Sequence, residues 1–108
     1  MALPRKNRIV KRTDFDELFK QGRAVRGSFL FIRALLSQKK FSRFVFLVSS
    51  KIVPGAVDRN RTRRIFSKIA QDFIKNNPAK NLDILVVLSK KEKEEILCQE
   101  LVKLLGKL

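Results

Sequence analysis

The side chains best suited to binding chemistry lie in the segment 59–68, which combines closely spaced cations with apolar residues at helical spacing. At about 100° per residue, the polar side chains cover roughly half of a helix circumference, and the apolar side chains cover the opposite arc. The polar arc contains Arg59, Asn60, Arg63, Arg64 and Lys68, and the apolar arc contains Ile65, Phe66, Ile69 and Phe73. Cations packed this closely repel one another, and a polyanionic partner removes that cost. The segment therefore predicts an amphipathic helix that binds phosphate groups, with Arg61 on its flank.

The charge of the whole chain indicates the same kind of partner. With 25 Lys and Arg against 10 Asp and Glu, the 108 residues carry a net charge of +15, which is typical of proteins that bind nucleic acid or anionic membranes. Residues 1–75 hold 19 basic and 5 acidic side chains, whereas residues 76–108 hold 6 and 5, so contact should concentrate in the first part of the chain. A membrane is the less favoured partner, because the apolar stripe of the basic helix is needed for the core. In addition, no run approaches the roughly 18 apolar residues of a membrane span.

Residues that could carry catalysis or hold a metal are scarce. The chain has no histidine and a single cysteine, Cys98, which excludes an internal disulfide and zinc sites of the usual Cys/His kind. Cys98 stands among apolar residues and is expected to pack as a small buried hydrophobic side chain. Asp14, Asp16 and Glu17 could hold a metal, but their place at the start of a helix accounts for them without one. The chain therefore predicts a binding protein with no catalytic residues and no metal ligands of its own.

Length and composition predict one domain. At 44% hydrophobic residues, residues 1–108 are expected to fold around a single small core. Residues 1–10 are basic, are interrupted by Pro4 and lead into no apolar segment, so no signal peptide is expected. We therefore expect the protein to reside in the cytoplasm.

The first half of the chain predicts a short helix followed by strands. The helix spans about residues 13–21, with Thr13 at its start and Gly22 after its end. The segments 28–36 and 43–50 are rich in Phe, Val and Ile and are separated by a polar turn, which predicts an antiparallel hairpin. A short additional strand is expected near residues 23–26.

The second half predicts a helix, a strand and a helix. The basic helix is expected over residues 58–75, and the apolar run 82–88, interrupted only by Asp83, is typical of a central strand covered on both faces. Ser89 and Glu92 predict a capping box for a final amphipathic helix. The order helix, three strands, helix, strand, helix predicts an α/β two-layer sandwich on a small, mainly antiparallel four-stranded sheet, with the basic helix as a crossover.

In the order and spacing of these features the chain resembles a known family, the protein component of bacterial ribonuclease P. The resemblance begins with a basic segment that leads into an aromatic helix: Asn7, Arg8, Ile9, Val10, Lys11, Asp14, Phe15, Phe19, Gly22 and Arg23. It continues with a Ser-Lys turn that leads into the arginine helix: Ser50, Lys51, Ala56, Val57, Arg59, Asn60, Arg63, Arg64 and Lys68. Lys68 stands where many members have arginine, and Pro54, Asp58 and Ile65 also depart from the usual pattern. The resemblance covers essentially the whole chain.

The resemblance implies both a topology and a function. The helix-bearing crossover would have the uncommon left-handed sense, although parallel crossovers are usually right-handed. The protein would join a large catalytic RNA, and the holoenzyme would hydrolyse precursor tRNA to create the mature 5′ end. The RNA subunit would perform the chemistry, with Mg²⁺ bound mainly by that RNA and the substrate. The expected partners are thus the ribonuclease P RNA subunit and precursor tRNA, with no membrane and no DNA.

The same resemblance implies which side chains meet RNA. Those directed at the RNA subunit are Arg59, Asn60, Arg63, Arg64 and Lys68, and those that extend the basic track are Lys51, Arg8, Lys11 and Arg12. Phe15 and Phe19 would line a cleft for the single-stranded 5′ leader, where stacking on an aromatic ring contributes about 1–3 kcal/mol per base. Their spacing alone is more typical of core residues, so the leader-binding interpretation requires at least one ring to be partly exposed. Asn60 could instead form a hydrogen bond at the helix start.

Two other classes share part of this pattern. A ribosomal or RNA-chaperone protein would have this charge and size, but usually with a basic tail or scattered lysines instead of the ordered Ser-Lys, Ala-Val, Arg-Asn and Arg-Arg spacing. A DNA-binding protein would need a helix-turn-helix pair and a dimer surface, and no second helix is expected at short range before the basic one. One dominant structured RNA bound in cells would distinguish the ribonuclease P interpretation from both.

Overall fold

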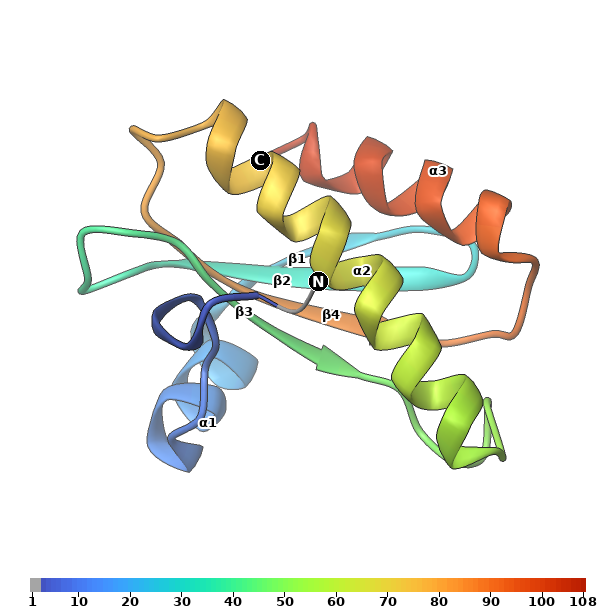
Figure 1. Cartoon of the computed structure of the whole chain (residues 1–108). Helices are drawn as coiled ribbons and strands as arrows, with labels where there is room; N and C mark the ends of the chain where they lie inside the picture. Colours follow the sequence, from blue (N-terminus) through green and yellow to red (C-terminus); the bar gives the residue numbers. More distant parts are fainter. Residues whose placement is uncertain (1–2) are drawn as a thin grey trace.

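The structure, a computed structural model of the chain, describes residues 3–108 and builds them into one mixed sheet flanked by helices (Figure 1). The elements are the 3-10 helix η1 (Arg5–Asn7), α1 (Arg12–Gln21), β1 (Arg23–Arg26), β2 (Leu30–Leu36), β3 (Arg43–Leu47), α2 (Ala56–Asn76), β4 (Leu82–Leu88) and α3 (Glu94–Leu105). The predicted strands at 23–26 and 82–88 have these bounds in the structure, and the basic helix extends slightly beyond the predicted 58–75. The predicted order of helices and strands is therefore confirmed.

The strand order is β1-β2-β4-β3, so β4 lies inside the sheet, as its continuous apolar run predicted. β2 pairs antiparallel with both β1 and β4, whereas β3 pairs parallel with β4. The predicted hairpin between residues 28–36 and 43–50 is wrong, because β4 lies between β2 and β3. The only hairpin of adjacent strands within residues 3–108 joins β1 to β2. Two of the three pairings are antiparallel, so the sheet is mixed.

The side chains of β4 alternate between the two faces of the sheet, and helices cover both. Ile84, Val86 and Leu88 belong to the larger core cluster, together with buried residues of α2 and α3. Leu85 belongs to a smaller cluster on the other face, with Ile9 and Leu18. Figure 1 shows α2 and α3 on one side of the sheet and α1 on the other. The predicted two-sided cover of the central strand is thus confirmed.

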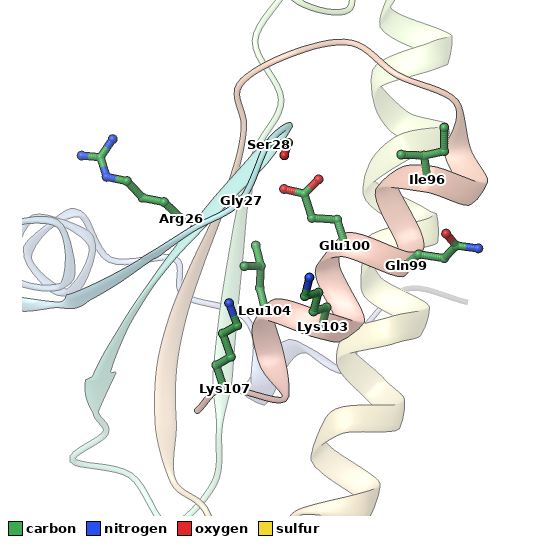
Figure 2. Close-up of a pocket in the computed structure, with 9 residues that line it drawn as sticks. All are labelled: Arg26, Gly27, Ser28, Ile96, Gln99, Glu100, Lys103, Leu104 and Lys107. Atoms are coloured by element: carbon green, nitrogen blue, oxygen red, sulfur yellow. The ribbon is translucent and has the colours of Figure 1, made fainter.

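The β1–β2 turn is fastened to α3 by Glu100. Its carboxylate accepts hydrogen bonds from the backbone N–H groups of Phe29, at 3.0 and 3.2 Å, and of Leu30, at 3.2 Å. Figure 2 shows Glu100 reaching from α3 toward Gly27 and Ser28. A Cβ atom at Gly27 would collide with this carboxylate, so a larger residue at this position would require the Glu100 side chain to move.

The predicted capping box at the start of α3 is wrong. The N-cap of α3 is Lys93, which makes no side-chain capping hydrogen bond, and the Glu92 carboxylate accepts from the adjacent Lys93 N–H instead. Ser89 and Lys90 donate their backbone N–H groups to the Phe29 carbonyl oxygen. The β1–β2 turn therefore holds these two residues outside the helix, which keeps Ser89 from acting as a cap.

Cys98 on α3 is half-buried rather than fully buried. Burial raises the pKa of its thiol, and the nearby charge of Glu94 raises it further.

Because the thiolate is the nucleophilic form, iodoacetamide at pH 8 should alkylate Cys98 more slowly than a cysteine in a short peptide. Urea should abolish the difference, and mass spectrometry of quenched samples measures both rates. Equal rates in folded and unfolded protein would contradict this environment for Cys98.

Candidate nucleic-acid interface

The basic face of α2 borders a hollow beside the edge strand β3. Arg63, Arg64 and Ser67 line this hollow of 260 Å³ from the helix, and Arg8 lines it from the N-terminal segment. Arg64 is exposed and Arg63 half-buried, and the apolar arc behind them carries the buried Phe66. We call this feature the α2 hollow. The predicted division of α2 into a cationic and a core-facing arc is confirmed.

A second hollow, of 360 Å³, adjoins it at the start of α1. Lys11, Arg12 and Phe15 line it from one side, and β3 residues line the other. We call it the α1 hollow. Both hollows are lined by Ile9, Val10 and Val45, so they adjoin one another beside β3. We call the two hollows together the path along β3.

The N-terminal segment reaches this place because it runs beside β3. Arg8 forms a parallel bridge with Phe44, and the Ile9 N–H donates to the Phe44 carbonyl oxygen at 3.0 Å. Ile9 is then buried against Leu18 and Leu85. These contacts place the basic residues on either side of Ile9 between α1 and α2.

The two aromatic rings of α1 are stacked and differ in exposure. The ring centroids of Phe15 and Phe19 lie 6.2 Å apart at an interplanar angle of 19°. Phe15 is half-buried against the smaller core cluster, whereas Phe19 is 48% exposed. The expectation that at least one ring is partly exposed is therefore confirmed. Of the two rings, only Phe15 lines the α1 hollow.

Arg33 of β2 is a member of this surface that the sequence analysis missed. Its guanidinium lies 5.1 Å from the centroid of the Phe19 ring, within reach of a cation–π interaction, and donates to the Gly22 carbonyl oxygen at 3.2 Å. An arginine in the middle of an apolar strand is the signal that could have identified it. Arg33 brings positive charge to the exposed aromatic ring.

The remaining predicted binding residues lie outside the two hollows. Arg59 donates to the carbonyl oxygens of Val53, at 3.0 Å, and Pro54, at 2.7 Å, and so closes the loop that precedes α2. Asn60 accepts from the Arg63 guanidinium at 3.1 Å and orients it; the N-cap of α2 is Gly55. Lys51, in the loop before α2, and Lys68, on α2, are exposed.

Two of the basic residues near the interface are paired with carboxylates. Arg12 lies 3.9 Å from Asp16 on the exposed surface of α1. Arg61, which the sequence places on the flank of the basic arc, forms an ion pair with Glu94 at 2.8 Å and links α2 to α3. Arg61 is therefore not simply solvated.

A cluster of three charged side chains links β3, β4 and α1. Arg43 of β3 donates from Nε and one terminal nitrogen to both carboxylate oxygens of Asp83 on β4, at 2.9 and 2.7 Å. Its other terminal nitrogen donates to Asp14 of α1 at 3.2 Å. The hydrogen bond with Asp83 is the main cause that raises the pKa of Arg43. Asp14 directly precedes Phe15 in the chain, and the cluster was not predicted from the sequence.

Metal and membrane contacts were also considered possible from the sequence. Residues 3–108 contain no group of three or more His, Cys, Asp or Glu side chains placed to hold a metal ion. Asp14, which the sequence offered as a possible ligand, is instead paired with Arg43. No helix in this part of the chain is both long and apolar enough to cross a bilayer.

Comparison with known proteins identifies the family. A sequence model described as Ribonuclease P matches residues 3–108. The chain belongs to the ribonuclease P protein family. The family resemblance read from the sequence is thus confirmed.

Relatives and solved structures agree with this family. The Ribonuclease P protein component of a Pseudanabaena species is 33% identical over 67% of this chain, and the match spans 63% of that relative. The protein of the same name from Vesicomyosocius okutanii is 27% identical over 98% of this chain and 94% of its own length. The fold is that of the RNase P protein from Thermotoga maritima, with a TM-score of 0.79 at 23% identity, covering 94% of this chain and 96% of that one. The Staphylococcus aureus RNase P protein has a TM-score of 0.77 at 22% identity, covering 94% of each chain.

Proposed function

We propose that this chain is the protein subunit of a ribonuclease P ribonucleoprotein. In this proposal it binds the catalytic RNA subunit and the 5′ leader of precursor tRNA, and the holoenzyme removes the leader to create the mature 5′ end. The observation that carries the proposal, together with family membership, is the path along β3, in which the two hollows adjoin. That path joins the arginines of α2 to the aromatic ring of α1, so one protein edge can contact two segments of RNA.

The two ends of the path suit different parts of RNA. Arg63 and Arg64 present guanidinium groups, whose planar forks match phosphate oxygens. Phe15 and Phe19 present π-faces, on which unpaired bases of any identity can stack. Arg33, held beside Phe19, adds positive charge for the backbone of the same strand. We therefore assign α2 to the RNA subunit and the α1 rings to the leader.

The side chains of this chain bind and position, and the hydrolytic chemistry belongs to the RNA subunit in this proposal. The chain has no histidine, the commonest general base. Asp14 and Asp83 are both paired with Arg43, so neither carboxylate is free to accept a proton from an attacking water. Mg²⁺ would be held mainly by the RNA subunit and the substrate.

Reconstitution tests the proposed function directly. The full chain is added to a bacterial ribonuclease P RNA and a 5′-labelled precursor tRNA at low Mg²⁺ concentration. We expect stimulated cleavage at the mature 5′ end relative to the RNA alone, and no cleavage by the protein alone. Absence of stimulation, or cleavage elsewhere, would contradict the proposal. RNA recovered with the protein from cells adds a second measurement, because one dominant structured RNA is expected rather than diverse RNA.

Truncation of Phe19 should affect precursor tRNA selectively. Since one stacked base contributes about 1–3 kcal/mol, Phe19→Ala should weaken the affinity of the holoenzyme for precursor tRNA by about 5- to 150-fold. Affinity for mature tRNA, which has no leader, should change little. Filter binding with both RNAs measures the two dissociation constants.

A control is needed because Phe19 is partly buried. Val102→Ala on α3 removes another exposed apolar side chain, and it should leave both affinities unchanged. Thermal unfolding must show that both variants remain folded. Equal losses of affinity for precursor and mature tRNA would mean that Phe19 has a purely structural role.

A further inference from the structure

A third hollow, of 600 Å³, lies on the other flank of α1 from the two aromatic rings. It opens between η1, the first half of α1 and the loop 37–42 that joins β2 to β3. Asp14 and Glu17 line it from α1, whereas Phe15 and Phe19 do not. The ion pair between Arg43 and Asp83 also lines it. We call this feature the N-terminal hollow.

Tertiary contacts hold the walls of the N-terminal hollow in place. Asn7, which is 4% exposed, donates from its side-chain amide to the Ser42 carbonyl oxygen at 2.8 Å. The ammonium nitrogen of Lys6 lies 5.4 Å from the centroid of the Phe41 ring. These contacts tie η1 to the loop 37–42, so the hollow exists before any ligand binds.

Positive charge dominates the lining. Six cations line the hollow against three carboxylates: Arg5, Lys6, Arg8, Lys11, Lys39 and Arg43 against Asp14, Glu17 and Asp83. Two of these carboxylates, Asp14 and Asp83, are already paired with Arg43. The remaining cations therefore attract an anion.

The same hollow exposes apolar surface. Leu36, which also lines it, is 75% exposed, and Val10 is 74% exposed. Bare aliphatic side chains beside uncompensated cations suit a ligand that has both a flat apolar part and a charged part. An unpaired nucleotide has this composition, since its base is largely apolar on its faces and its phosphate is anionic.

We propose that the N-terminal hollow binds an unpaired nucleotide of RNA, with phosphates on Lys6 and Lys39 and the base against Leu36. The proposal rests on the proposed function in that the ligand is RNA. It adds contacts with Lys6, Leu36 and Lys39, which line neither hollow of the path along β3. RNA bound on both flanks of α1 would contact this helix over a larger surface than the leader alone.

Photo-crosslinking locates the contact. The full chain is irradiated with an octamer that contains 4-thiouridine, digested with trypsin and analysed by mass spectrometry. We expect crosslinks to the peptide of residues 34–39, which contains Leu36, in addition to crosslinks to α1 and α2. Crosslinks confined to peptides of α1 and α2 would overturn the proposal.

Matched charge reversals test the cations. Lys6→Glu with Lys39→Glu should weaken binding of a fluorescein-labelled oligouridylate octamer by about tenfold more than Lys103→Glu with Lys107→Glu. Both pairs change the net charge equally, and the second pair lies beside the β1–β2 turn (Figure 2). Fluorescence anisotropy measures the affinities. Equal losses for the two pairs would show that only the total charge matters and would overturn the proposal.

A substitution that leaves the charge unchanged distinguishes the contact with the base from the contact with the phosphate. Leu36→Ala should weaken binding of the octamer by about threefold and leave binding of inorganic polyphosphate unchanged, because only the octamer has a base to lose the apolar contact. Leu36 is mostly exposed, so the variant should fold. Equal affinities of wild type and Leu36→Ala for the octamer would overturn the base contact. Polyglutamate serves as a competitor that has negative charge but no base. If it displaces the octamer as effectively as unlabelled RNA does, the hollow binds an acidic protein partner and the proposal is overturned.

The outcomes for the hollow and for the proposed function are distinct. Failure of the proposed function appears as unstimulated cleavage in the reconstituted reaction. Failure of the nucleotide site appears as missing crosslinks at residues 34–39, whatever the cleavage rate.

Discussion

Asp83→Ala should lower the free energy of unfolding by about 3–5 kcal/mol, because it leaves the guanidinium of Arg43 buried without its main partner. The two side chains are only 11% and 9% exposed, and both carboxylate oxygens of Asp83 accept hydrogen bonds from Arg43. Removing one partner of a buried ion pair lowers stability by far more than the pair contributes to it, since the remaining charge is buried away from water. Urea denaturation followed by circular dichroism measures the change.

Asp14→Ala is the matched control for this prediction. It removes a carboxylate from the same arginine, but Asp14 is 30% exposed and accepts a single hydrogen bond from it. We expect a loss of about 1 kcal/mol or less, as for other exposed ion pairs. Similar small losses for the two variants would mean that water reaches Arg43 and would contradict the prediction for Asp83→Ala.

Arg63→Ala with Arg64→Ala should weaken association with the ribonuclease P RNA by roughly 150-fold or more at low salt. Hydrogen bonds to charged groups contribute about 1.5–3 kcal/mol each, and two are removed. The slope of log affinity against log salt concentration should flatten by about 1 to 2 units, because fewer counterions are released. Gel-shift titration at several salt concentrations measures the affinity and the slope.

The fold should tolerate this double substitution. Arg64 is exposed, and the hydrogen bond of Arg63 goes to Asn60 on the same helix. Lys75→Ala with Lys80→Ala, which removes two exposed cations at and beyond the other end of α2, is the control and should change the affinity much less. An unchanged slope in the arginine variant, or equal losses of RNA affinity in the two variants, would mean that Arg63 and Arg64 face solvent and do not contact the RNA.

The arginines of α2 differ in the contacts that they make. Arg63 and Arg64 line the α2 hollow, whereas Arg59 closes the loop before the helix and Arg61 joins α2 to α3. The sequence predicts that Arg59 contacts RNA together with the others, and this stays a prediction. A helical projection shows the direction of a side chain and not the carbonyl oxygens within its reach. The loop contacts of Arg59 make it a residue that positions the start of α2.

Much of the local structure could be predicted because its causes are local. The apolar run at 82–88 fits a strand covered on both faces, and β4 is that strand. The periodicity of residues 59–73 separates the cationic from the buried arc of α2, as the structure confirms. Spacing and hydrophobic pattern act over a few residues, so the sequence shows them directly.

The arrangement of the strands and the complete interface depend on contacts between distant residues, and only the tertiary structure decided them. A short polar turn suggested that β2 and β3 pair, but β4 offers each of them a fully buried neighbour and lies between them. Arg43 meets Asp83 across 40 positions of the chain, and Arg8 reaches Phe44 through a bridge. Such pairings depend on the burial of the whole sheet, and no local periodicity of apolar residues in the sequence indicates them. The sequence therefore predicted most of the side chains that we propose to bind RNA, and the packing of β3 between α1 and α2 determined which of them share one surface.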